Sequence, residues 1–334
     1  MRRRSLLLAA VPAGLLTLAG CGDDSSDSGG TGPSPSGSAS SAPPPKLVRG
    51  PLPAVTAGER FGEKPTVAKG PGEPSKNIAV RTLIAGGGRT VAENDFIRAD
   101  YLGQIWDTGK VFDNSYDRKR PLVIQLAQGS IVDGWRYALQ GKKAGSRVQI
   151  AVPPAWGYGK GGNPQAGIKG TDTLVFVIDL IESFNSGSSA KGTAVPQDDA
   201  ALPKVGTNTD GKPPKVTVPR TDPPKKLVSQ YVLEGDGPGL KADQTVLCQF
   251  QGLVWDGGKT FERTYGSNRL SQFSLKQMQE VVKGLAQGLT GKKVGSRVLI
   301  VVPPELGYGD KPPGGGVIEK GSTLVFTVDI LAAM

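Results

Sequence analysis

The sequence has no histidine and little cysteine: no imidazole occurs in 334 residues, and Cys21 and Cys248 are the two thiols. The missing imidazole excludes Ser-His-Asp triads, Cys-His dyads and His-ligated zinc. Two cysteines cannot form a disulfide framework. Cys248 lies in an alternating apolar stretch, and we expect it to be a buried, unreactive thiol.

Aromatic residues are also scarce, at 6%, while glycine (48) and proline (27) are abundant. This composition favours modest, sheet-rich cores joined by long linkers, and the length allows about two domains. The net charge of +10 is compatible with an acidic neighbour. However, the lysines are scattered through predicted loops, so we expect a solvated surface and no nucleic-acid partner.

The first 21 residues predict an export signal. Three arginines precede an apolar stretch too short for a good membrane-spanning helix, and "LAGC" ends it at Cys21. This order resembles a bacterial lipoprotein signal, which implies lipidation of Cys21. An ordinary signal peptide with an incidental cysteine is the alternative. Residues 22–49, rich in Ser, Gly and Pro, are predicted to be a disordered tether. The predicted location is the outer face of the cytoplasmic membrane.

The remainder of the chain contains one domain twice. "GKKAGSRVQIAVPPAWGYG" begins at Gly141 and "GKKVGSRVLIVVPPELGYG" at Gly291, and fourteen of the nineteen positions agree. Other segments repeat at offsets of 148–150, which indicates duplicated globular domains. We place these domains at 50–184 and 201–334, with residues 185–200 as a linker.

Each copy predicts strands and one short helix. "DFIRADYLGQIW" alternates as a strand does, and "RVQIAVP" and "TLVFVIDLI" are β-branched apolar runs. In "SIVDGWRYALQG", apolar residues recur at helical spacing. Ser130 is a candidate for the start of this helix and Gly141 for its end. The fold class is therefore α+β, an antiparallel sheet with one helix in each copy.

From Thr90 to Ser183 the first copy resembles the FKBP family of peptidyl-prolyl cis-trans isomerases. The resemblance rests on "DYLGQIWDTGKVFDNSYDRKRPL", "GSIVDGWRYALQGKKAGSRVQIAVPPAWGYG" and "TLVFVIDLI". It implies a twisted sheet wrapped around the helix and a proline pocket between them. The catalytic residues that it implies are Tyr101, Phe112, Asp113, Trp135, Tyr158 and Phe176. The substrate-binding residues that it implies are Arg118, Leu122, Ile131, Val132 and Ile168. Leu122 stands where the family usually has an aromatic residue, which puts the pocket's preference in doubt.

The same chemistry follows from the residue types. Rotation about an X-Pro bond crosses a barrier of about 20 kcal/mol without nucleophilic attack, cofactor or metal. The twisted transition state has lost its amide resonance and is less polar than the planar bond. An apolar aromatic cage with a few hydroxyl groups therefore suits it. Singly, each of these aromatic residues would be assigned to a core, and only the joint pattern favours a site.

The second copy has changed at its polar positions. Phe250 replaces Tyr101, Glu262 replaces Asp113, Leu285 replaces Trp135, and Ser267 falls where Arg118 stands in the first copy. We expect the same fold with a weak isomerase pocket that holds unfolded chains. The weak pocket comprises Phe250, Phe261, Glu262, Val281, Val282, Leu285, Tyr308, Ile318 and Phe326.

The sequence therefore predicts an isomerase that assists folding of proline-containing exported polypeptides. The alternative is a non-catalytic proline-binding module, tethered to the membrane. A lipoprotein carrier for a small ligand would need a deeper cavity. The resemblance also implies binding of macrolide immunosuppressants.

Overall fold

The computed structural model describes residues 45–267 and 269–334. The predicted signal segment, Cys21 and most of the predicted tether lie outside these residues. The part of the chain that is described contains no helix long and apolar enough to cross a membrane.

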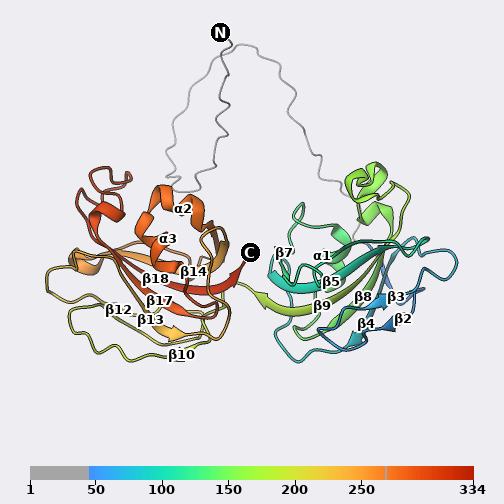
Figure 1. The fold of residues 1–334 in the computed structure, drawn as a ribbon, viewed down its shortest axis with the longest axis horizontal. Coiled ribbons are helices and arrows are strands. Elements are labelled where there is room, and N and C mark those ends of the chain that lie inside the picture. Colours follow the sequence, from blue (N-terminus) through green and yellow to red (C-terminus); the bar gives the residue numbers. More distant parts are fainter. Residues whose placement is uncertain (1–44, 268) are drawn as a thin grey trace, which may run out of the picture. The chain divides into compact units, whose positions relative to one another are not determined.

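The first domain is a seven-stranded sheet with one α-helix packed on it (Figure 1). The sheet order is β1-β4-β8-β9-β5-β6, with β7 also paired to β5. The pairs are antiparallel except for the short parallel pair of β1 with β4. The elements are β1 (Leu47–Val48), β2 (Val55–Ala57), β3 (Thr66–Val67), β4 (Ile78–Ile84), β5 (Phe96–Ile105), β6 (Val111–Asn114), β7 (Leu122–Gln125), α1 (Asp133–Leu139), β8 (Arg147–Val152) and β9 (Leu174–Phe184).

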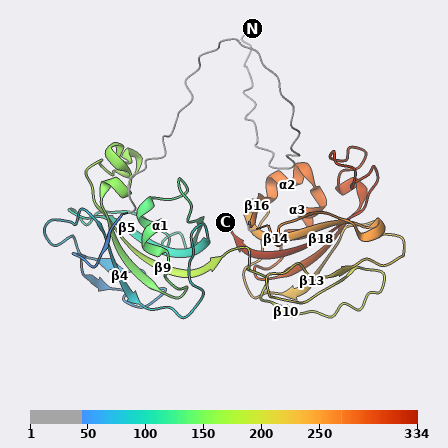
Figure 2. The ribbon, with the colours of Figure 1, turned by 180° about the vertical axis from the view of Figure 1, so that it is seen from behind.

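The second domain repeats this sheet as β10-β13-β17-β18-β14-β15, with β16 paired to β14 (Figure 2). The α+β class and the duplicated fold are therefore confirmed. The elements are β10 (Thr193–Ala194), β11 (Lys204–Val205), β12 (Val216–Thr217), β13 (Val228–Glu234), β14 (Thr245–Val254), β15 (Thr260–Arg263), β16 (Ser271–Ser274), α2 (Leu275–Val281), α3 (Lys283–Leu289), β17 (Arg297–Val302) and β18 (Leu324–Ala333).

The helices differ from the sequence-based expectation in two details. Ser130 does not cap α1: the N-cap residue is Val132, which makes no side-chain hydrogen bond. The second domain has two consecutive helices rather than one. The segment that joins β16 to α3 is one residue longer than the segment that joins β7 to α1, and it lacks glycine. It forms α2, which Ser274 caps by accepting a hydrogen bond from the Gln277 amide. The corresponding segment of the first domain contains Gly129, with φ +79°.

Each sheet separates two hydrophobic clusters because successive side chains of a strand point to opposite faces. On β5, Ile97, Ala99 and Tyr101 face α1, whereas Leu102, together with Trp106 just after the strand, packs on the other face. That other face is covered by the domain's own N-terminal arm, residues 45–77, through Val48, Leu52, Val55 and Val67. In the second domain an arm over residues 186–222 takes this role through Leu202, Val205, Val216 and Val218.

Buried polar side chains of the sheet bind the backbone of each arm. Arg147 makes a bidentate pair with Asp179, at 2.6 and 2.7 Å, and both side chains are fully buried. The same guanidinium donates to the carbonyl oxygens of Gly58 and Glu63, and Asp179 accepts from the Gly62 amide. In this way the arm satisfies polar groups that would otherwise be unpaired in the interior.

The second domain repeats the arrangement with Arg297 and Asp329, whose two hydrogen bonds measure 2.6 and 2.8 Å. Arg297 donates to the carbonyl oxygens of Gly206 and Asn208, and Asp329 accepts from the Ala190 amide. Part of the predicted linker thus contacts the second sheet, which it also joins through β10. Likewise β1 lies within the last residues of the predicted tether.

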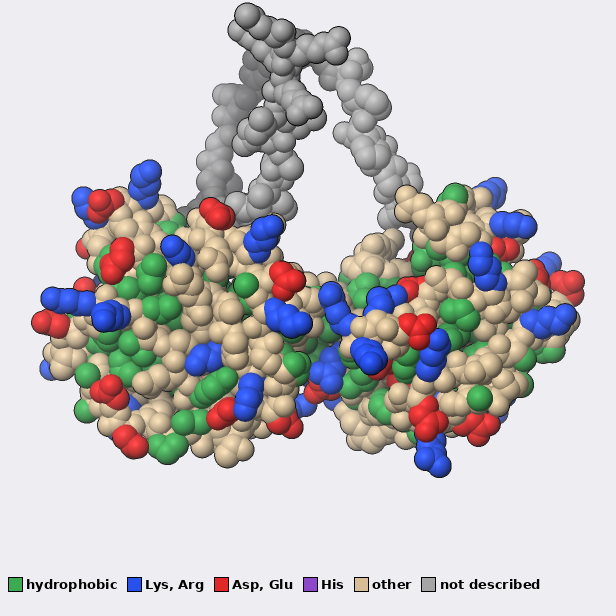
Figure 3. All heavy atoms as spheres, in the orientation of Figure 1, with side chains coloured by type: hydrophobic (Ala, Val, Ile, Leu, Met, Phe, Trp, Pro, Cys, Tyr) green, Lys and Arg blue, Asp and Glu red, His purple; other side chains and the backbone are tan. Residues whose placement is uncertain are grey.

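The surface carries lysine and arginine side chains over much of the visible face, with acidic groups between them (Figure 3). Several cations are paired with acids at the surface, such as Lys64 with Asp117 and Lys293 with Glu234. Exposed pairs of this kind are screened by solvent and contribute little to the stability of the fold.

Candidate functional site

A cavity of about 360 Å³ lies between α1 and the sheet of the first domain. Nine of the eleven residues predicted for the first pocket line it. These nine are Tyr101, Phe112, Asp113, Leu122, Ile131, Val132, Trp135, Tyr158 and Phe176. Arg118 does not line the cavity but binds two residues that do. Ile168 is 3% exposed and belongs to the same hydrophobic cluster as Trp135 and Phe176.

Three further lining residues escaped the sequence-based assignment: Ile124, Gly129 and Ser130. Ile124 lies two residues after Leu122 on β7, so both side chains point to the same face of the strand. The alternation of the strand could therefore have identified Ile124 as well. Gly129 and Ser130 belong to the irregular segment before α1, where residue type alone gives no indication of direction.

Four aromatic rings form a continuous wall and floor. Trp135 on α1 meets Tyr101 and Phe176 edge-to-face, with ring centroids 5.4 Å apart in both pairs. Phe176 in turn meets Phe112 at 5.7 Å. Gly103 makes room for this contact, because a Cβ there would lie 2.7 Å from Phe112 and 2.9 Å from Phe176. The strands and helix therefore fix the rings in a rigid apolar cage.

Two hydrogen-bond donors face this cage, and neither has an acceptor among the described residues. The Trp135 indole nitrogen is buried and has no hydrogen-bond partner among the described residues. Tyr158 lies in the turn after β8 and is 41% exposed. A bound substrate could offer acceptors to both groups.

A charged trio borders the cavity. The Tyr101 hydroxyl and the Arg118 guanidinium both donate to Asp113, and Arg118 also donates to the Tyr101 oxygen at 3.0 Å. Burial alone would raise the pKa of Asp113, but the hydrogen bonds from Tyr101 and Arg118 hold it below its usual value. Burial and the Asp113 charge raise the pKa of Tyr101 to about 12. At neutral pH the trio is therefore a compensated carboxylate–guanidinium pair with a protonated phenol.

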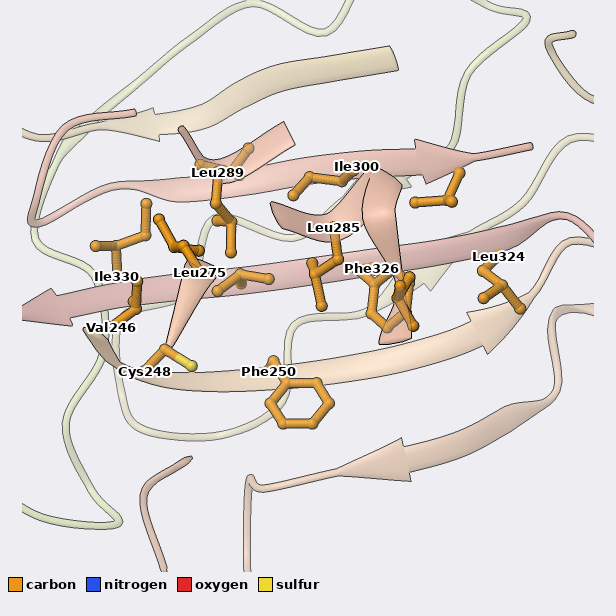
Figure 4. Packing of buried hydrophobic residues seen from close by; sticks show 14 of the residues in the cluster. Val246, Cys248, Phe250, Leu275, Leu285, Leu289, Ile300, Leu324, Phe326 and Ile330 are labelled. Carbon is orange, nitrogen blue, oxygen red and sulfur yellow. The ribbon is translucent and has the colours of Figure 1, made fainter. Parts of the chain in front are cut away.

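The second domain keeps the apolar shell but not the trio. Phe250, Phe261, Val282, Leu285, Tyr308, Ile318 and Phe326 belong to one cluster between α3 and the sheet, part of which Figure 4 shows. Phe261 and Phe326 retain the edge-to-face contact at 5.7 Å. Val281 is separate, at the end of α2 and 50% exposed. Cys248 is fully buried in this cluster, as predicted.

The residues that correspond to the first pocket differ chemically in the second domain at three positions. Phe250 has no hydroxyl to donate, and Ser267 donates to the Thr264 carbonyl at 2.6 Å instead of to Glu262. Leu285 supplies a smaller floor without an indole donor. Neither domain has a metal site in the described residues, where no group of three His, Cys, Asp or Glu side chains could hold an ion.

Comparison with known proteins identifies both domains. The family model for FKBP-type peptidyl-prolyl cis-trans isomerases matches residues 87–181 and again 237–331. Both arms that cover the sheets lie wholly outside these matches.

Three relatives illustrate the similarity. The chain is 39% identical over 119 residues to an FK506-binding protein of Streptomyces anulatus, covering 36% of this chain and 95% of that protein. It is 34% identical over 143 residues to the Escherichia coli K12 FKBP-type peptidyl-prolyl cis-trans isomerase FkpA, covering 43% and 50%. It is 30% identical over 245 residues to human peptidyl-prolyl cis-trans isomerase FKBP9, covering 73% and 35%.

The trio makes a testable prediction about Asp113. Replacing Arg118 with serine, the residue at the matching position 267, should raise the pKa of the Asp113 carboxyl because a donor and a positive charge are both lost. The ¹³C chemical shift of the carboxyl carbon, followed from pH 2 to 7, measures this change. Arg120→Ser is the matched control, since Arg120 makes no recorded side-chain contact with Asp113. Equal Asp113 titration in both variants would contradict the assigned role of Arg118.

Proposed function

The chain belongs to the FKBP-type peptidyl-prolyl cis-trans isomerase family, and we propose that its first domain carries most of the isomerase activity. The observation that supports this division is the continuous row of edge-to-face contacts from Tyr101 through Trp135 and Phe176 to Phe112, four rings that line the 360 Å³ cavity. The charged trio beside it holds Asp113 and Tyr101 in fixed positions. In the second domain the trio is absent and Leu285 replaces the indole floor.

The mechanism proposed for the first pocket is preferential binding of the twisted X-Pro bond. Trp135 supports the proline ring, and Phe112 and Phe176 exclude water from the bond. As the bond twists, resonance is lost and the transition state becomes less polar, so the dry cage stabilises it more than the ground state. The Tyr158 hydroxyl donates to a substrate carbonyl, and no proton is transferred. Because Arg118 forms an ion pair with Asp113, the carboxylate brings no unpaired charge to this apolar region.

Matched substitutions in the full chain test the division of activity. Phe176→Ala should lower kcat/KM for a proline tetrapeptide at least about tenfold, because it opens a cage wall and removes two aromatic contacts. Phe326→Ala, at the equivalent place in the second domain, should lower it less than about twofold. The measurement is the cis-to-trans rate of the peptide. Circular dichroism confirms that each variant is folded. Equal losses in the two variants would contradict the proposal.

For the second domain we propose that the surviving apolar shell binds proline-containing segments with little turnover. Its smaller floor, Leu285 in place of an indole, supports binding rather than catalysis. The clients proposed for the whole chain are exported polypeptides with X-Pro bonds. Macrolides that fit the family's pocket would compete at the first site. A non-catalytic tethered module remains the second candidate for the whole chain, and the Phe176→Ala comparison separates the two.

We also propose that the protein is exported and anchored through a lipid on Cys21. The support is the order of the basic segment, the apolar stretch and "LAGC" in the sequence. In a bacterial host, Cys21→Ser should abolish incorporation of labelled fatty acid and move the protein out of the membrane pellet. Cys248→Ser is the control, because that thiol is buried. Labelling that persists in Cys21→Ser would refute the anchor.

A further inference from the structure

Glu262 occupies the position of the charged trio in the second domain without the rest of the trio. On β15 it pairs with Gly252, just as Asp113 on β6 pairs with Gly103. In the first pocket, the Asp113 carboxylate receives hydrogen bonds from Tyr101 and Arg118. Within residues 45–267 and 269–334, Glu262 has no side-chain hydrogen-bond partner, and the charge that acts on it is that of the exposed Arg269. The second domain therefore keeps the carboxylate without the hydrogen-bonded phenol and guanidinium that accompany it in the first.

The surroundings of Glu262 make an uncompensated carboxylate costly. The residue is half-buried and follows Phe261, whose ring forms part of the apolar shell with Phe326. Burial raises the pKa of Glu262, which the charge of the exposed Arg269 only partly opposes. Tyr308, on the turn after β17, is near enough that the Glu262 charge adds to burial in raising the pKa of its hydroxyl. A cation brought next to Glu262 would relieve this penalty.

We infer that the second pocket selects proline segments with a lysine or arginine next to the proline, whose cation pairs with Glu262. This inference rests on the proposed binding of proline segments by the apolar shell of the second domain. The apolar shell accepts the proline ring, and Phe261 belongs both to that shell and to the strand that carries Glu262. Because Glu262 is the chain neighbour of Phe261, a cation bound at its carboxylate would be carried by a residue close to the proline in the ligand.

The first pocket should not share this preference. Arg118 already occupies the carboxylate of Asp113, so an incoming lysine would meet a compensated pair and a like charge. The two domains would then prefer different ligands according to the charge next to the proline. The second domain would bind the segments with a basic residue there. Glu262 is longer than aspartate by one methylene, which extends the carboxylate farther from its strand toward such a ligand.

Amide chemical shifts of the ¹⁵N-labelled full chain can report binding at each pocket separately. Gly159 follows Tyr158 in the first pocket, and Gly309 follows Tyr308 in the second. The probes are acetylated tetrapeptides with lysine or glutamine immediately before the proline, and a second pair with these residues immediately after it. At Gly309, one lysine peptide should bind about fivefold more tightly than its glutamine counterpart. At Gly159, the two affinities should agree within about twofold.

Two variants locate the preference. Glu262→Gln should reduce the lysine preference at Gly309 to about one while the glutamine peptide still binds. Arg118→Ser, which copies position 267, should create a lysine preference at Gly159. Equal affinities of both peptide pairs at Gly309 in the unmodified chain would overturn the inference, as would a preference that survives Glu262→Gln.

The same titration separates this inference from the proposed function. Peptide binding and isomerisation at the first pocket without a lysine preference at the second would refute the charge selection alone. If no peptide shifted either Gly159 or Gly309, the proposed function would fail together with the inference.

Discussion

The fold of each domain depends on one buried ion pair, Arg147 with Asp179 in the first and Arg297 with Asp329 in the second. Both pairs are fully buried, and removing one partner of such a pair typically costs about 3–5 kcal/mol. Each guanidinium also binds carbonyl oxygens of the arm, so the pair closes one face of the sheet with the domain's own backbone. The opposite face is left for the helix and the pocket. The side chains of each strand therefore point alternately to the structural face, which the arm covers, and to the functional face, which holds the helix and the pocket.

On the functional face, the two copies have kept their shape and changed their charge. The edge-to-face contact of Phe112 with Phe176 has the same 5.7 Å centroid separation as that of Phe261 with Phe326. The surrounding polar groups differ: one carboxylate is compensated and the other is not. Since an apolar shell accepts proline and charges beside it select its neighbours, the proposed difference in preference between the two sites follows from this difference in polar groups.

Much of this could be predicted from the sequence, because strand alternation and helical spacing are local. The period of two in β5 places Tyr101 on the functional face, and the spacing of apolar residues places Trp135 on a helix. The pocket itself required the family resemblance, since Trp135 alone is indistinguishable from a core residue. The polar groups that bind each arm to its sheet could not be identified, because Arg147 stands at the start of an apolar run that gives no indication of its partner. The helix α2 was missed because the inserted residue changes a loop whose conformation depends on tertiary contacts.

A crystal structure of the full chain with a proline tetrapeptide would test the central claim most directly, namely that the aromatic cage of the first domain is the isomerase site. The account predicts the proline ring against the Trp135 indole, between Tyr101 and Phe176, with the Tyr158 hydroxyl donating to a peptide carbonyl. A peptide bound in the second domain, with the Trp135 cavity empty at saturating concentration, would contradict it.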